Sequence, residues 1–387
     1  MTLKRNSKLF LVLFLGTLSA FGPFVTDLYL PALPTMSSYF NSSTSTIQLT
    51  LTGSMVGLAL GQLLIGPISD KYGRKNPLII SLIVYLISTI AIIIFPNVYA
   101  MIALRFIQGV SSAGAVVISR AISTDLYHGR ELAAFFALLM AVNGLAPILS
   151  PILGSLLLEL TDWRGIFVTL ALIGVILLAV SFKFNESLAI EKRLDLPITK
   201  TYYSIVHVAK NRLFFALVII QGFALATMFA YIAASPFILQ THYSLSPLMY
   251  SLCFGLNGFA IVLGSKNAGN FKEKISIKLG LSLMLLVSIY LAAALTLTLP
   301  FLFIEVGFFL LLLGLGFILP AGSAIAMSLE RERAGSASAF FGFVPFFLGG
   351  VVSPLVGIGN IFHSSAIAIV ICSTISFITF KLVEKKI

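Results

Sequence analysis

The sequence contains twelve long apolar runs, and these constrain the fold more than any other feature. A helix needs roughly 20 apolar residues to cross a hydrocarbon core of about 30 Å. Lipid offers the backbone no hydrogen bonds, so only helices and closed barrels span it, and continuous runs of this length indicate helices. The predicted spans are 8–32, 46–68, 77–95, 98–120, 132–157, 164–183, 213–239, 248–265, 277–298, 301–325, 335–358 and 364–382.

The composition points to lipid as the solvent of this chain. Of the 387 residues, 58% are hydrophobic and 10% charged, and the mean hydropathy is +1.04, which is more apolar surface than one soluble core can bury. The basic start before the first apolar run is also typical of a cleaved signal peptide, but the run continues to Leu30, so we expect a retained first helix.

The sequence carries no pattern of an enzyme. The loops between the spans are too short for a soluble catalytic domain, and there is no GxxxxGK[ST], no GxSxG and no Cys/His cluster with metal-ligand spacing. We therefore expect no catalytic activity, no cofactor and no metal.

Basic residues gather in alternate loops. If both termini face the cytoplasm, all but two of the 25 Lys and Arg residues lie on the cytoplasmic side; Arg164 lies outside and Arg105 lies within a span. The positive-inside rule then predicts cytoplasmic termini for a multi-pass protein of a cell membrane, with a bacterial cytoplasmic membrane as the expected location. The net charge of +11 reflects this topology, and nucleic-acid binding is not expected.

A polar connection divides the chain into halves. We expect an N-terminal six-helix bundle over 1–184, a cytoplasmic linker over 185–212 and a C-terminal six-helix bundle over 213–387. A faint repeat supports this division, because Gly57 and Gly66 correspond to Gly255 and Gly264. The second copy has Ala268 where the first has Asp70.

The segment GPISDKYGRK, at 66–75, resembles the cytoplasmic loop motif of the major facilitator superfamily. Four further segments resemble the bicyclomycin-resistance (Bcr/CflA) branch of the drug:proton antiporters: TDLYLPALP at 26–34, LRFIQG at 104–109, GLAPILSPILG at 144–154 and SPF at 235–237. The resemblance implies an all-α major facilitator fold with two pseudo-symmetric six-helix bundles around a midplane cavity. It also implies proton-coupled export of small amphipathic drugs or metabolites. One departure is Ala146-Pro147, where such antiporters commonly have Gly-Pro.

Two other functions stay open at this stage. The chain could instead be a proton symporter or facilitator for uptake, or a non-transporting membrane receptor. The expected partners are a small-molecule substrate, protons and the lipid bilayer, and we expect a monomer. The sequence does not identify the substrate, because closely similar members export different compounds.

Three ionisable residues inside predicted spans are the candidates for proton coupling. Asp27 lies roughly 29 Å of helix beyond Lys8, and a carboxylate at membrane depth is costly unless it has a function. Arg105 can act on a neighbouring acid or bind an anion, but it cannot carry the proton. Glu305 is the acid of the tenth span. The alternatives are an interfacial Asp27 beside Pro31 and side chains of Arg105 and Glu305 that extend to the interface.

The remaining candidates fall into three sets. The loop motif is expected to latch the cytoplasmic side, with topology alone as the other interpretation of its basic residues; it comprises Gly66, Asp70, Gly73, Arg74 and Lys75. The residues expected to line the substrate cavity are Phe24, Tyr29, Gln108, Ser112, Asn143, Gln221, Tyr231 and Asn257. A helix-packing motif on one face of the fifth span consists of Gly144, Pro147, Pro151 and Gly154.

Overall fold

The structure is a computed structural model that describes residues 7–193, 198–330 and 333–386. Within these ranges, twelve helices are long and apolar enough to cross a membrane, as the sequence predicts. Three basic residues of the predicted charge asymmetry lie outside the described residues: Lys4, Arg5 and Arg331. The linker residues 194–197 also lie outside them.

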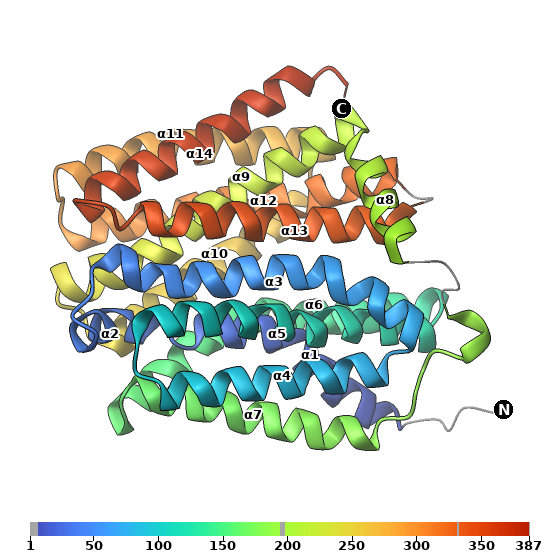
Figure 1. The fold of residues 1–387 in the computed structure, drawn as a ribbon. Coiled ribbons are helices and arrows are strands. Elements are labelled where there is room, and N and C mark those ends of the chain that lie inside the picture. Colours follow the sequence, from blue (N-terminus) through green and yellow to red (C-terminus); the bar gives the residue numbers. More distant parts are fainter. Residues whose placement is uncertain (1–6, 194–197, 331–332, 387) are drawn as a thin grey trace. The chain divides into compact units, whose positions relative to one another are not determined.

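The described ranges consist of helices joined by short loops, and no strand occurs in them (Figure 1). In the first part of the chain the helices are α1 Lys8–Asp27, α2 Leu33–Tyr39, α3 Thr44–Tyr72, α4 Lys75–Ile94, α5 Val98–Leu126, α6 Gly129–Leu160 and α7 Trp163–Lys183. In the second part they are α8 Ile198–Ala209, α9 Arg212–Pro236, α10 Pro247–Ala268, α11 Glu273–Thr296, α12 Phe301–Leu329, α13 Ala334–Leu355 and α14 Ile361–Val383. Short 3-10 or π turns cover Leu30–Ala32, Ile190–Lys192 and Phe237–His242.

The first span is longer than the sequence predicts and is interrupted. Helix α1 ends at Asp27, a 3-10 turn follows over Leu30–Ala32, and α2 continues to Tyr39. Proline has no N–H and cannot continue a regular α-helical ladder, which fits the break near Pro31. The apolar stretch as a whole runs over Leu9–Tyr39, so the predicted end at residue 32 is wrong. Asp27 therefore lies within the length of the span rather than at its end.

Other boundaries also differ from the prediction. Helix α9 passes into a π-helical turn over Phe237–His242, so the seventh span continues beyond the predicted end at residue 239. Part of the polar linker is helical, as α8 over Ile198–Ala209. A helix with one apolar face can form in a segment of mixed polarity, which inspection for long apolar runs does not detect.

The chain forms two compact units. The first comprises residues 1–30 and 53–201, and the second comprises residues 31–52 and 202–387. In the first unit α4 packs against α5 and α7, and α1 packs against α5 and α6; Figure 1 shows α4 and α7 side by side. In the second unit α12 packs against α10 and α11, and α14 packs against α9 and α11.

The first two turns of α3 are part of the second unit. Two of their side chains donate hydrogen bonds to backbone carbonyls of other helices in that unit. Thr52 Oγ1 donates to the Gly350 carbonyl at 2.9 Å, and Gln48 Nε2 donates to the Ala233 carbonyl at 2.8 Å. Gly350 lies four residues before Pro354 in α13, and proline has no N–H with which to complete the helical bond. The threonine hydroxyl therefore satisfies a carbonyl that the helix itself leaves without a donor.

A close helix contact in the first unit depends on a glycine of α6. A β-carbon at Gly154 would overlap the carbonyl oxygen of Leu28, directly after the end of α1. Gly144, ten residues earlier in α6, is exposed and has no heavy atom within 4 Å of an added β-carbon. Of these two glycines from the predicted packing motif, only Gly154 makes a close contact.

We expect Gly154→Ala to lower the thermal stability of the detergent-purified protein by about 1–3 kcal/mol, the usual cost of overpacking. The matched control is Gly144→Ala on the same helix, which should be neutral or slightly stabilising because alanine favours helices over glycine by about 1 kcal/mol. Equal thermal-unfolding midpoints for the two variants would contradict the close contact at Gly154.

Candidate functional site

Four of the predicted site residues lie together in the first unit, and we refer to Asp27, Tyr29, Arg105 and Gln108 as the arginine cluster. Arg105 has no exposed surface, and its Nη1 donates to the Val25 carbonyl at 3.0 Å and to Gln108 Oε1 at 2.6 Å. Val25 is in the last turn of α1, where carbonyls lack helical donors. The end of α1 thus supplies an acceptor for a charge that lipid cannot solvate.

The arginine is further fixed by its neighbours. Gln108 donates from Nε2 to Thr89 Oγ1 at 2.7 Å, which links α5 to α4. The guanidinium carbon of Arg105 lies 4.2 Å from the centre of the Tyr29 ring and 5.7 Å from that of Phe167. Aromatic faces attract cations at such distances, so these rings stabilise the buried charge and hold its orientation.

Asp27 is the acid of the arginine cluster. It is the last residue of α1, its side chain is 8% exposed, and Arg105 is close enough to act on it electrostatically. The hydrogen bonds described above direct the guanidinium to Val25 and Gln108. The predicted control of Asp27 titration by Arg105 stays a prediction.

A second cluster lies in the second unit, and we refer to Tyr231, Asn257 and Glu305 as the glutamate cluster. All three side chains are buried, and Asn257 Nδ2 donates to Glu305 Oε1 and to the Tyr231 hydroxyl, both at 3.0 Å. The Tyr231 ring packs against Phe308, with ring centres 4.7 Å apart. Helices α9, α10 and α12 each contribute one member.

Two polar atoms of the glutamate cluster can still accept a hydrogen bond. Glu305 Oε2 and Asn257 Oδ1 are buried and have no hydrogen-bond partner among the described residues. Buried acceptors without donors are costly, so such atoms call for an explanation in terms of function or solvent. Here the glutamate carboxyl group has an oxygen to which a proton can be added.

The loop motif forms a third cluster in the first unit, which we call the loop cluster: Asp70, Arg74, Asp125 and Glu186. Arg74 is 5% exposed and binds Asp125 with two hydrogen bonds, Nε to Oδ2 at 2.9 Å and Nη2 to Oδ1 at 3.2 Å. Its Nη1 donates to Asp70 Oδ1 and to Ser69 Oγ. Burial opposes the charge, but the hydrogen bonds and charges of Asp125 and Asp70 raise the pKa of Arg74 above its usual value.

Glu186 completes the loop cluster from the segment that follows α7. Its carboxylate accepts from the backbone N–H groups of Arg74 at 2.9 Å and Lys75 at 3.1 Å, at the start of α4. A carboxylate at a helix N-terminus satisfies free N–H groups and complements the helix dipole. Gly73 has a φ of +89°, and a β-carbon there would lie 2.6 Å from Glu186 Oε2, so the turn requires glycine.

Sequence reasoning did not identify Asp125 or Glu186 as parts of the loop cluster, nor Ser187 as a partner of Asp125. Asp125 lies in α5, 51 residues from Arg74, and also accepts from Ser187 Oγ at 2.8 Å. The available signal was that Asp125 and Glu186 lie in segments predicted to be cytoplasmic, as the basic loop is. Pairing them with Arg74 required the three-dimensional structure.

The other predicted residues belong to none of these three clusters. Ser112 is buried and donates to the carbonyl of Gly109 in its own helix, and half-buried Asn143 donates to Ser19 Oγ at 2.6 Å. Gln221 is 7% exposed on α9. The remaining side chains are Phe24, half-buried on α1; Pro147 and Pro151, half-buried and buried on α6; Gly66 on α3; and Lys75, whose Nζ donates to the Phe182 carbonyl.

Twelve helices that can span a membrane, with charged residues buried in both units, define a multi-pass membrane protein. A model of the Major Facilitator Superfamily matches residues 9–354, and the chain belongs to this family. Its members are transporters rather than enzymes.

Similar proteins agree with this assignment. The chain is 36% identical to an uncharacterized MFS-type transporter of Bacillus subtilis (strain 168), over 92% of this chain and 90% of the relative. It is 28% identical to a bicyclomycin resistance protein homolog of Haemophilus influenzae, over 70% of this chain and 69% of the relative. The xylose transporter XylE from E. coli superimposes with a TM-score of 0.73 over 97% of each chain; at 13% identity this likeness shows the fold alone.

We expect Arg74→Lys to reduce thermal stability by about 1.5–3 kcal/mol, since lysine keeps the charge but loses the paired hydrogen bonds to Asp125. The control is Arg164→Lys, because Arg164 forms a more exposed ion pair with Asp162 and should lose little. Thermal unfolding in detergent measures both variants. If Arg74→Lys is destabilised no more than the control, the paired hydrogen bonds of Arg74 to Asp125 do not contribute to stability.

Proposed function

We propose that this protein is a proton-coupled exporter of small amphipathic drugs or metabolites that works by alternating access. The observation that carries the proposal is a buried acid in each compact unit, Asp27 in the arginine cluster and Glu305 in the glutamate cluster. Ionisable groups inside membrane spans are costly and commonly belong to proton or substrate pathways. The carboxyl groups can bind and release protons, whereas Arg105 keeps its charge.

The two clusters differ in ways that support separate roles. Asp27 shares its cluster with a fixed cation, Arg105, that acts on it electrostatically. Glu305 instead accepts a hydrogen bond from the neutral amide of Asn257, which also donates to the Tyr231 hydroxyl. Movement of a proton onto either acid changes the local charge, and a charge change in an apolar medium can favour one conformation over another.

The direction and substrate class rest on relatives and on side-chain chemistry. The name of the Haemophilus relative associates it with bicyclomycin resistance, which export would provide. Aromatic residues pack around the polar members of both clusters, as Phe167 and Phe308 show. Apolar pockets with few polar groups suit amphipathic ligands.

The loop cluster is proposed to latch one conformation of the transporter at the cytoplasmic side. Arg74 joins α3 to α5, and Glu186 joins the start of α4 to the segment after α7. These contacts join three helices and the segment after α7 at this end of the first unit. We also propose that 1–184 and 213–387 act as two six-helix bundles joined by the linker over 185–212.

Transport assays in everted membrane vesicles distinguish export from uptake. An exporter driven by proton exchange accumulates substrate in such vesicles when the interior is acidic, and the accumulated substrate is lost when the pH gradient is collapsed. A symporter for uptake would not accumulate substrate under this gradient, and a receptor would bind ligand without any dependence on it. Substrates for the assay come from a growth screen of expressing cells against toxic compounds.

We expect Asp27→Asn and Glu305→Gln each to reduce proton-driven accumulation at least about tenfold, because each removes a titratable group while keeping its shape. The controls Asp162→Asn and Glu159→Gln make the same changes at exposed acids and should transport normally. Thermal unfolding confirms that each variant is folded. Undiminished pH-gradient-driven transport in a folded Asp27→Asn or Glu305→Gln variant would remove that acid from the mechanism.

The proposed topology has both termini in the cytoplasm. A green fluorescent protein fused after the last residue should therefore fluoresce, and alkaline phosphatase at the same position should be inactive. The control is a pair of fusions at Thr161, between α6 and α7, where the phosphatase should be active instead. The reverse pattern would overturn the orientation inferred from the distribution of Lys and Arg.

A further inference from the structure

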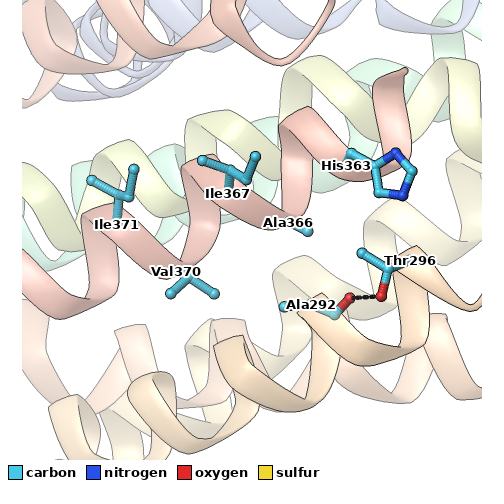
Figure 2. Close-up of a pocket in the computed structure, with 7 residues that line it drawn as sticks. All are labelled: Ala292, Thr296, His363, Ala366, Ile367, Val370 and Ile371. Carbon is cyan, nitrogen blue, oxygen red and sulfur yellow. Dashed lines mark hydrogen bonds between the residues drawn. The ribbon is translucent and has the colours of Figure 1, made fainter. Parts of the chain in front are cut away.

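Two apolar grooves flank α14 in the second unit. One, with a volume of about 410 Å³, lies between α14 and α11 and is drawn in Figure 2. The other, of about 520 Å³, lies on the side of α14 that faces α9 and α13, where Phe223 and Val352 contribute to its wall. Neither groove contains a member of the clusters described above.

The two grooves share the outer surface of α14. His363, Ile367 and Ile371 line both, and they follow one another at intervals of four residues along one face of the helix. Figure 2 shows His363 at one end of the groove and Ile367 and Ile371 further along α14. The isoleucines are 59% and 51% exposed, so a ligand can contact them from outside the bundle. Each groove therefore runs along the helix from a common polar end.

Two side chains offer hydrogen-bond donors at that polar end. The His363 ring carries an N–H donor, and Asn360, which lines the larger groove, carries a side-chain amide. Thr296 lines the smaller groove across from His363, but its hydroxyl donates to the Ala292 carbonyl at 2.7 Å and can only accept a hydrogen bond from a ligand (Figure 2). The loops at 240–247, 296–301 and 356–361, which connect the helices at this end, contain no Asp or Glu.

We propose that a two-chain phospholipid straddles α14, with one acyl chain in each groove and its phosphate at His363. The grooves are apolar along α14 and each has about the volume of one acyl chain, which matches a ligand with two apolar tails. Their common end offers donors and no carboxylate, which matches an anionic phosphodiester with acceptor oxygens only. This lipid site is independent of the proposed transport function.

The geometry favours one diacyl lipid over two separate occupants. Because the grooves meet at a single polar group, one headgroup at His363 positions both chains at once. Binding of the second chain is then intramolecular and gains from its high effective concentration. Blocking either groove should consequently weaken the binding of the whole lipid.

Native mass spectrometry of the purified full-length protein, titrated with dioleoyl phosphatidylglycerol, tests the proposal. Ala368 lines only the larger groove and Val370 only the smaller one, so Ala368→Trp and Val370→Trp each fill a single groove. Each variant, and His363→Ala, should bind the lipid at least about tenfold more weakly than wild type. The control is Ile378→Trp, at an exposed position of α14 outside both grooves, which should bind as wild type does.

A single-chain lysophosphatidylglycerol provides the second comparison. It should bind at least about tenfold more weakly than the two-chain lipid and should lose affinity in only one of the two groove-filling variants. Equal binding of the one-chain and two-chain lipids, or unchanged binding of the two-chain lipid when one groove is filled, would overturn the straddling arrangement. Unchanged binding in His363→Ala would remove the headgroup assignment. Thermal unfolding of every variant shows that lost binding does not come from misfolding.

Discussion

A fully buried arginine in an apolar bundle needs acceptors, and much of the first unit is arranged around this requirement. The charge of Arg105 cannot be left unsolvated at membrane depth, because water is absent and the dielectric constant is low. Helix α1 ends where its Val25 carbonyl can accept from the guanidinium, and Gln108 and the Tyr29 ring complete the surroundings. The break in the first span therefore supplies an acceptor that the buried charge of Arg105 requires.

The same constraint explains polar contacts elsewhere in the chain. Thr52 donates to the Gly350 carbonyl, whose helical partner is lost at Pro354. In the loop cluster, Glu186 accepts from the N–H groups that α4 leaves unsatisfied at its start. In both places a side chain from another helix or loop satisfies backbone groups that the helix itself leaves unpaired.

The twelve spans could be predicted because hydrophobicity over about 20 residues is a local property of the sequence. Asp27, Arg105 and Glu305 could be identified as candidates because an ionisable residue in an apolar run is conspicuous. The hydrogen bonds of Asn257 to Tyr231 and Glu305 could not, since they join residues 26 and 48 positions apart on three different helices. The extension of the first span to Tyr39 was missed because prolines usually mark the end of a helix, and here the chain resumes its helical path after them.

The position of Glu186 has a consequence for protein engineering. This carboxylate fastens the segment after α7 to the start of α4, and Arg193 lies 3.9 Å from it. The contacts of the loop cluster are therefore complete before α8 begins at Ile198. A foreign domain inserted between Arg193 and α8 would leave these contacts in place, so a fluorescent reporter could be carried at that position.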